Sequence, residues 1–269
     1  MGTPWDAAAP QYLEEWVPRI LPYHVDLVQE MALEPCARVL VAGAGPGAEV
    51  LAVARVLGEK GYVRATDKSR AMVELCREQV ARAGLGARVE CHEADATAAD
   101  APDGQPWDAI LCAFSLWQLE SPAGAVRAWA RALAPAGRIG IITWGPNEPG
   151  GPFGVLRASL DDIAPGHHVP DPSVLAEREA MAKMFRDAGL VMVRHTVVRH
   201  TLSFPTAAAF VRAMREGCSW NRIGQELGDV LFERVAVRFC EAFGGPNAPL
   251  AFDPPATLAI GAWQDGNGS

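Results

Sequence analysis

A cluster of glycines, Gly43, Gly45 and Gly47, directly follows the short apolar stretch Val39 to Ala42. The continuous hydrophobic pattern of that stretch is typical of a central strand in a parallel sheet. Because glycine permits positive φ and close backbone approach, we expect the strand to end in a turn too tight for side chains. The next segment, Ala48 to Leu57, is predicted to be a helix whose free N–H groups face an anionic or carboxylate-bearing ligand.

Two further predicted strands end in acidic residues at the same edge of the sheet. Tyr62 to Thr66 is followed by Asp67, and Arg88 to His92 is followed by Glu93 and Asp95. Asp67 lies about 20 residues after the glycines, the spacing at which an acid grips a ribose diol in dinucleotide-binding proteins. Either acid alone is more often a loop residue or a helix cap. Together with the glycine turn they predict a site for a nucleoside-containing cofactor, with Asp95 placed to accept from an adenine amine.

With these residues the chain resembles the class I S-adenosylmethionine-dependent methyltransferases, and within them the small-molecule group that includes the ubiquinone and menaquinone methyltransferases. The resemblance extends from Trp5 to about Gln264. It is carried by the runs Val39-Leu-Val-Ala-Gly-Ala-Gly-Pro-Gly47, Thr66-Asp67-Lys68-Ser69 with Met72 following, Glu93-Ala-Asp95-Ala96, Trp107-Asp-Ala-Ile-Leu111 and Leu133-Ala-Pro-Ala-Gly137-Arg-Ile-Gly140. It implies S-adenosylmethionine as cofactor and S-adenosylhomocysteine as product.

The resemblance also implies a role for each matched position. The turn made by Gly43, Ala44, Gly45 and Gly47 would hold the methionine end of the cofactor. Asp67 would hold the ribose hydroxyls, and Asp95 with Ala96 the adenine edge. The segment from Trp5 to Ala9 looks like the N-terminal helix that this family closes over the cofactor. The further candidates for cofactor contact are Tyr12, Lys68, Met72 and Phe114.

The chain departs from the family pattern at two places. The family usually carries an acid two residues before the first glycine, where this chain has Val41. After the fourth strand the family often has histidine, whereas this chain reads Leu116-Trp117-Gln118-Leu119. A base normally contributed at that place is therefore missing.

Composition favours a folded protein that acts on small molecules. The 269 residues carry a net charge of −8, with a pI of about 5.3, so attraction to nucleic-acid phosphate is not expected. The six cysteines show no Cys-x-x-Cys pair and no zinc-like spacing with histidine, which predicts free thiols and no metal site. No stretch resembles a signal peptide or reaches the length of a membrane span. We therefore expect a cytoplasmic protein whose partner is a small-molecule substrate, with neither nucleic acid nor membrane involved.

The order of predicted elements indicates one α/β domain, a doubly wound, mostly parallel Rossmann-like sheet with a helical lid. Residues 1–35 would form N-terminal helices over the cofactor, and 36–144 the cofactor-binding core. Residues 145–269 would complete the sheet, with lid insertions at 145–173 and 206–255. Predicted details include a helix capped by Ser69, a fifth strand from Arg138 to Trp144, and one long strand from Leu190 to Phe204.

Candidate catalytic and substrate residues lie in the N-terminal, loop and lid segments. His167 and His168 are adjacent on a loop bounded by Gly and Pro, and either could serve as general base for a substrate hydroxyl; the alternative is that both are ordinary exposed histidines. His24 is the competing base. Aromatic and polar residues from several segments are candidates to line an apolar substrate pocket: Trp16, Trp117, Gln118, Phe153 and Trp220.

Three functions are compatible with these patterns. The first is methyl transfer from S-adenosylmethionine to a small, largely apolar metabolite, with O-methylation favoured over N- or C-methylation. The second is a methyltransferase-like protein that keeps the cofactor as structure and acts as a cyclase or partner subunit. The third is a nicotinamide-dependent oxidoreductase, against which stand the absence of a Tyr-x-x-x-Lys pair and the long segment before the glycine turn.

Overall fold

The computed structural model describes residues 3–101, 103–167, 169, 171–217 and 220–264. Its main sheet is built from β1 (Arg38–Ala42), β2 (Tyr62–Asp67), β3 (Val89–Glu93), β4 (Trp107–Ala113), β5 (Leu133–Trp144), β6 (Leu190–Arg199) and β9 (Pro255–Trp263). The strand order is β3-β2-β1-β4-β5-β9-β6. The first five strands run parallel, and β9 runs antiparallel to both β5 and β6. The predicted mostly parallel sheet is confirmed.

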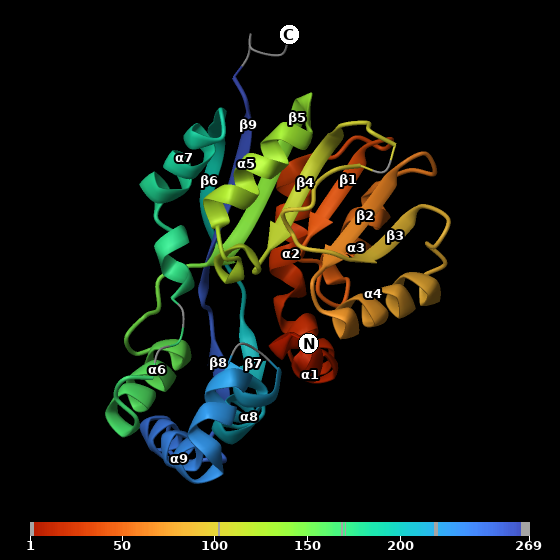
Figure 1. Cartoon of the computed structure of the whole chain (residues 1–269). Helices are drawn as coiled ribbons and strands as arrows, with labels where there is room; N and C mark the ends of the chain where they lie inside the picture. Colours follow the sequence, from red (N-terminus) through yellow and green to blue (C-terminus); the bar gives the residue numbers. More distant parts are fainter. Residues whose placement is uncertain (1–2, 102, 168, 170, 218–219, 265–269) are drawn as a thin grey trace.

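Helices cover both faces of this sheet, as Figure 1 shows. On one face pack α2 (Val17–Met31), α3 (Ala48–Val56) and α4 (Arg70–Arg82), and on the other α5 (Pro122–Ala132) and α7 (Arg178–Asp187). The side chains of β1 alternate accordingly, because neighbouring residues of a strand point to opposite faces. Val39 and Val41 belong to the first hydrophobic core, and Leu40 and Ala42 to the second. All four are completely buried, as expected of a central strand.

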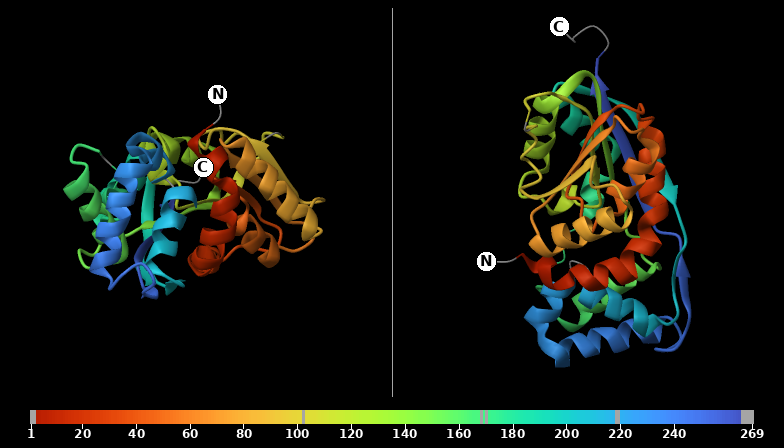
Figure 2. Two further views of the ribbon diagram at one scale, coloured as in Figure 1. Left: turned by 90° about the horizontal axis from the view of Figure 1, so that it is seen from below. Right: turned by 90° about the vertical axis from the view of Figure 1, so that its right-hand side faces the viewer.

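A second group of elements lies beyond the carboxyl ends of the parallel strands. It contains α6 (Pro152–Ile163), α8 (Ala207–Gly217) and α9 (Trp220–Ala242), with a small antiparallel sheet of β7 (Leu202–Phe204) and β8 (Leu250–Phe252). The N-terminal helix α1 (Pro4–Gln11) and the π-helical turn η1 (Tyr12–Trp16) lie between this group and the main sheet (Figures 1 and 2). Short 3₁₀ turns η2 (Leu116–Gln118) and η3 (Pro172–Leu175) complete the described elements.

Local signals set the ends of several helices. The Ser69 side chain accepts a hydrogen bond from the backbone N–H of Met72 at 3.2 Å, and so caps α4 as predicted. In the same way Ser121 accepts from the N–H of Gly124 at the start of α5. Among the described residues, no helix is long and apolar enough to cross a membrane.

The expected long strand from Leu190 to Phe204 is wrong, since the chain forms β6 and β7 in two different sheets. The break falls at His200, whose backbone N–H donates to the Tyr23 hydroxyl at 3.0 Å instead of to a neighbouring strand. The same hydroxyl donates to the carbonyl of Pro254 at 2.7 Å. Tyr23 is completely buried in α2, so a contact 177 residues away in sequence decides where the strand ends.

One further strand boundary differs from the predicted one, and one strand was not predicted. β5 begins at Leu133 rather than at Arg138, because Leu133 already pairs with Trp107 ahead of a register shift. The predicted lid insertion 206–255 also contains the strand β8, which was not predicted. A three-residue strand carries too short a pattern to be distinguished from loop.

Candidate cofactor and substrate site

The glycine turn between β1 and α3 has no room for side chains at two of its positions. Gly43 has φ +70°, and a Cβ there would lie 2.3 Å from the Ser115 hydroxyl oxygen. Gly47 has φ +95°, and a Cβ there would lie 2.8 Å from the sulfur of Cys76. Positive φ and close contacts both exclude residues other than glycine at these positions. Because glycine has no side chain, the backbone of the turn is open to close approach by a ligand.

Asp67, at the end of β2, is oriented by backbone N–H groups on both of its oxygens. Its Oδ2 accepts from the N–H of Gly45 at 2.9 Å, and its Oδ1 from the N–H of Ser69 at 2.8 Å. Burial raises the pKa of Asp67 above its usual range, while these two hydrogen bonds act in the opposite direction. The carboxylate therefore couples the glycine turn to the start of α4 and keeps further lone pairs available.

Asp95 follows β3 and is more exposed. Its Oδ1 accepts from the backbone N–H of Thr97 at 2.9 Å and from the Thr97 hydroxyl at 2.7 Å. The bond from the Thr97 N–H is the main reason why the pKa of Asp95 lies below its usual value. The ammonium of Lys68 lies 3.7 Å from Asp95 Oδ2, so an ionised acid and a lysine face the same opening.

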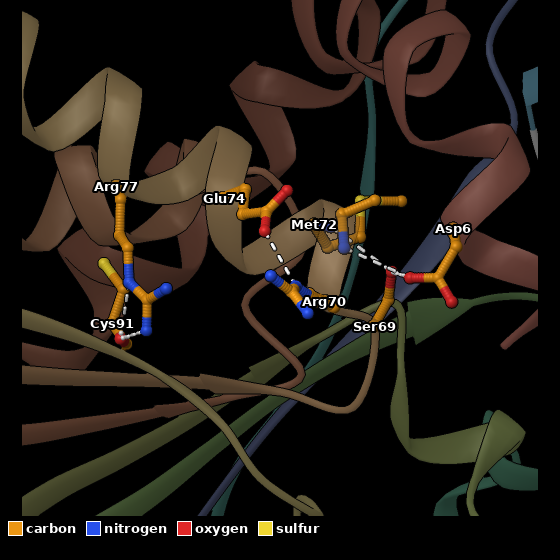
Figure 3. A network of polar contacts seen from close by, with 8 residues as sticks. Asp6, Ser69, Arg70, Met72, Glu74, Arg77 and Cys91 are labelled. Atoms are coloured by element: carbon orange, nitrogen blue, oxygen red, sulfur yellow. Dashed lines mark hydrogen bonds and ion pairs between the residues drawn. The ribbon is translucent and has the colours of Figure 1, made fainter. Parts of the chain in front are cut away.

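Helix α1 is attached to both sides of this opening. Asp6 accepts from the Ser69 hydroxyl at 2.6 Å and from the backbone N–H of Ala71 at 3.1 Å (Figure 3). On the other side, the indole N–H of Trp5 donates to the side-chain oxygen of Gln118 at 2.6 Å. The hydrogen bond from the Ser69 hydroxyl is the main cause of the lowered pKa of Asp6. Since Asp6 binds the start of α4 and Trp5 binds Gln118 of η2, α1 spans the opening between these two elements.

These elements enclose a cavity of about 510 Å³ at the carboxyl ends of β1, β2 and β4. Nine of the eleven predicted cofactor residues line it: Tyr12, Gly43, Gly45, Asp67, Lys68, Met72, Asp95, Ala96 and Phe114. Ala44 and Gly47 belong to the same turn but are buried and do not line the cavity. The structure thus brings together residues from five separate segments of the sequence.

A second, aromatic pocket of about 90 Å³ adjoins this cavity. All five predicted substrate residues line it: Trp16, Trp117, Gln118, Phe153 and Trp220. The two cavities share Trp5, Tyr12, Phe114, Trp117 and Gln118. Phe114 lies at this boundary with φ +52°, a conformation that is uncommon for a bulky residue and typical of functional sites. Its ring centroid lies 4.4 Å from that of Trp144, which in turn lies 5.4 Å from Phe153.

The predicted histidine bases do not gather at the site. His24 is buried in α2 beside Phe114, neither ring nitrogen has a partner among the described residues, and burial lowers its pKa to about 4. His167 lies after α6, with Nδ1 3.2 Å from the carbonyl of Ala164. His168 lies outside the described residues. Neither His24 nor His167 lines either cavity, so the structure gives no support to these two as bases.

Sequence reasoning missed several lining residues. Ser115 and Arg222 line the larger cavity, and Trp144, Asn147 and Arg157 line the pocket. Trp144 ends β5, so the rule that ligands bind beyond the carboxyl ends of the strands would have included it. Arg157 sits in α6, where no local pattern of the sequence distinguishes it from a surface arginine.

Part of the chain matches a known protein family. Residues 39–137 match the family described as a methyltransferase domain. This match, the strand order and the strand-end cavity agree with the resemblance of the sequence to class I S-adenosylmethionine-dependent methyltransferases. The ubiquinone/menaquinone biosynthesis C-methyltransferase UbiE of Vibrio cholerae is 30% identical over 108 residues, which are 40% of this chain and 41% of that protein. The match thus spans about two fifths of this curated relative.

Solved structures resemble the chain over most of its length. The cyclase SpnF superimposes with a TM-score of 0.61 and 21% identity, over 94% of this chain and 84% of SpnF. A methyltransferase from Thiobacillus denitrificans, crystallised with S-adenosylhomocysteine, superimposes with a TM-score of 0.56 and 19% identity, over 90% and 92% of the two chains. At these identities the likeness shows the fold alone.

Proposed function

We propose that this chain transfers a methyl group from S-adenosylmethionine to a small, largely apolar acceptor that carries a planar ring. The observation that carries the proposal is the boundary between the two cavities, which share five residues. A molecule in the larger cavity would therefore lie against a molecule in the aromatic pocket. In-line displacement needs mainly this kind of alignment, because the methyl donor and the nucleophile must be held together in a near-attack geometry.

The residues of the larger cavity fit the cofactor. Asp67 has a carboxylate already oriented by two backbone N–H groups, with lone pairs left for the ribose hydroxyls. Asp95, held by Thr97, is an acceptor for the adenine amine. The open backbone of Gly43 and Gly45 would receive the methionine end. When bound, S-adenosylmethionine supplies an electrophilic methyl group, and the protein's part is to bind and orient it.

The lining of the aromatic pocket indicates the kind of acceptor. Most of its side chains are apolar or aromatic, and Arg157 alone among the described lining residues carries a formal charge at neutral pH. The guanidinium of Arg157 is held by a 2.5 Å bond from Nη1 to the carbonyl of Val169. At the boundary, the buried indole N–H of Trp117 has no partner among the described residues. A flat ring bearing an anionic oxygen would suit both donors.

The reacting atom is proposed to be one that needs no histidine base. A neutral hydroxyl would need such a base and is therefore excluded as the acceptor. The proposed acceptor atom is a carbon of an electron-rich ring, or an oxygen already ionised beside Arg157. The proposal is supported by the placement of His24 and His167 away from both cavities. The curated relatives are named as C-methyltransferases, which agrees with it. The preference for O-methylation, which rested on a histidine base, is accordingly withdrawn.

Native mass spectrometry and calorimetry of the purified protein test the function. We expect S-adenosylhomocysteine to bind and NAD not to bind. Labelled S-adenosylmethionine, offered with a panel of phenolic and enolic acids, should label at least one acceptor. Tight cofactor binding without transfer to any acceptor would instead favour the protein that keeps its cofactor as structure, and a preference for NAD would overturn the assignment altogether.

Replacing Arg157 by glutamine should raise KM for an anionic acceptor at least tenfold, because a charge-assisted hydrogen bond contributes about 1.5–3 kcal/mol. The affinity for S-adenosylhomocysteine should not change, since Arg157 does not line the larger cavity. The methyl ester of the same acceptor should be used by the two proteins within about threefold. The control is Arg238→Gln, which removes an exposed guanidinium paired with Asp162. An equal loss for acid and ester would contradict the assignment of Arg157 to the anionic group.

A further inference from the structure

Two thiols face each other beneath the glycine turn. Cys76 on α4 and Cys91 on β3 have their sulfur atoms 3.3 Å apart, and their residues are 1% and 8% exposed. They lie 15 residues apart in sequence, a spacing that matches no cysteine motif. Neither is needed for the methyl transfer proposed above, so the pairing calls for a separate explanation.

The surroundings of the two sulfur atoms make them chemically unequal. The hydrogen bond between the thiols lowers the pKa of Cys91 and raises that of Cys76. Arg77 donates from Nε and Nη2 to the carbonyl of Cys91, at 3.1 and 2.7 Å, and so holds a positive charge beside that residue (Figure 3). Cys91 is also the less buried of the two. It is therefore the thiolate that a small oxidant would meet, with Cys76 in place to react second.

We propose that Cys76 and Cys91 are an oxidation site for hydroperoxides, which convert them into a reversible disulfide that weakens cofactor binding. The Cys91 thiolate attacks one oxygen of hydrogen peroxide, the O–O bond breaks, and the hydroxide released takes up a proton to become water. The Cys76 thiol then attacks the sulfenic sulfur, the S–O bond breaks, and the leaving oxygen departs as water with the Cys76 proton. Overall, two thiols lose two electrons and two protons while one peroxide becomes two waters.

The link to the cofactor follows from what touches Cys76. Its sulfur would lie 2.8 Å from a Cβ at Gly47, so the glycine turn rests directly on it. A disulfide holds its sulfurs about 2.05 Å apart, so the 3.3 Å pair must close by more than 1 Å. Close-packed interiors transmit such shifts. The bond would also join α4, which carries Met72, to the strand that leads to Asp95, and both of these residues line the cofactor cavity.

Peptide mapping without reduction, after treatment with a small excess of hydrogen peroxide, tests the site. We expect a cross-linked pair of peptides containing Cys76 and Cys91, lighter by two hydrogens and separated again by a thiol reductant. Cys91→Ala should abolish the cross-link, and so should Cys76→Ala, whereas Cys36→Ser should form it normally because Cys36 is exposed and distant in sequence. A persistently reduced pair, or a cross-link to any other cysteine, would overturn the proposal.

Calorimetry of the same samples tests the consequence, which rests on the proposed cofactor. Oxidation should weaken S-adenosylhomocysteine binding at least threefold in the wild type and leave Cys91→Ala unchanged, and reduction should restore the wild-type affinity. A complete cross-link with unaltered affinity would refute the effect on the cofactor. If the reduced wild type bound no S-adenosylhomocysteine, the proposed function would fail, while the mapping would still decide on the oxidation site by itself.

Discussion

Asp67→Asn is expected to weaken binding of S-adenosylhomocysteine at least tenfold. The substitution keeps the volume of the side chain but removes the charge that would accept from the ribose hydroxyls. Hydrogen bonds to charged groups contribute about 1.5–3 kcal/mol each, and about 1.4 kcal/mol corresponds to a factor of ten. Calorimetry with wild type and variant gives the ratio of the two affinities directly.

For Asp95→Asn we expect a smaller loss of affinity than for Asp67→Asn. The loss should be the same for S-adenosylmethionine and S-adenosylhomocysteine, because both molecules carry the adenine.

A control separates the ribose contact from damage to the loop, since Asp67 also holds the N–H groups of Gly45 and Ser69. Asp6→Asn removes a carboxylate that bonds to the same loop but does not line the cavity. It should change affinity less than Asp67→Asn does. An analogue of S-adenosylhomocysteine without ribose hydroxyls should bind the wild type weakly and show little further loss with Asp67→Asn. If the two losses added fully, Asp67 would not contact the ribose.

Glu49→Gln is expected to stabilise the protein above neutral pH. Glu49 follows the glycine turn in α3 and is 1% exposed. Its Oε1 has no partner among the described residues, although the N–H of Ala113 bonds to the carboxyl group. Burial raises the pKa of Glu49 from 4.5 to about 8. The folded protein therefore keeps this proton while the unfolded chain has lost it, and the free energy of unfolding falls as pH rises from 4.5 to 8.

The window from pH 6.5 to 8 isolates this effect. His24, whose pKa is lowered from 6.5 to about 4, destabilises the folded protein progressively as pH falls through 6.5, and its contribution to the slope fades within about one pH unit above that value. One proton corresponds to about 1.4 kcal/mol per pH unit, so Glu49 should cost the wild type about 2 kcal/mol across the window. Glutamine removes that slope and can still accept from the Ala113 N–H.

Urea denaturation at several pH values measures the difference between the two proteins. Subtracting the curve of the wild type from that of Glu49→Gln removes the contributions of all other groups. Glu59→Gln, at an exposed position beyond the end of the same helix, should leave the slope unchanged. Parallel curves for wild type and Glu49→Gln would show that Glu49 is ionised in the folded protein.

Much of the cofactor side could be read from local patterns. The glycines, the acids that end β2 and follow β3, and the Ser69 cap each depend on a few neighbouring residues. Parallel strands place their carboxyl ends along one edge, so residues at those ends meet in space without further information. For this reason most of the predicted cofactor residues lie together in one cavity.

The substrate side was only partly accessible in this way. Large aromatic residues in the N-terminal and lid segments suggested an apolar pocket, and Trp16 and Trp220 do line one, though 204 positions separate them. His24 was a candidate base, but it falls in the buried stripe of α2 between Ile20 and Leu27. The helical spacing of that stripe was therefore a signal for its burial. Arg157 carried no local signal, and its place in the lining of the pocket appears only in the fold.

From its sequence alone, then, this chain determines an alternating α/β core, a glycine turn that admits a ligand, and acids at the strand ends, because each follows from short-range sterics or strand periodicity. Only the tertiary structure decided two other features. It interrupted the predicted long strand through Tyr23, and it brought the sulfurs of Cys76 and Cys91 to 3.3 Å. These features depend on contacts between distant segments, and packing selects such contacts for the molecule as a whole.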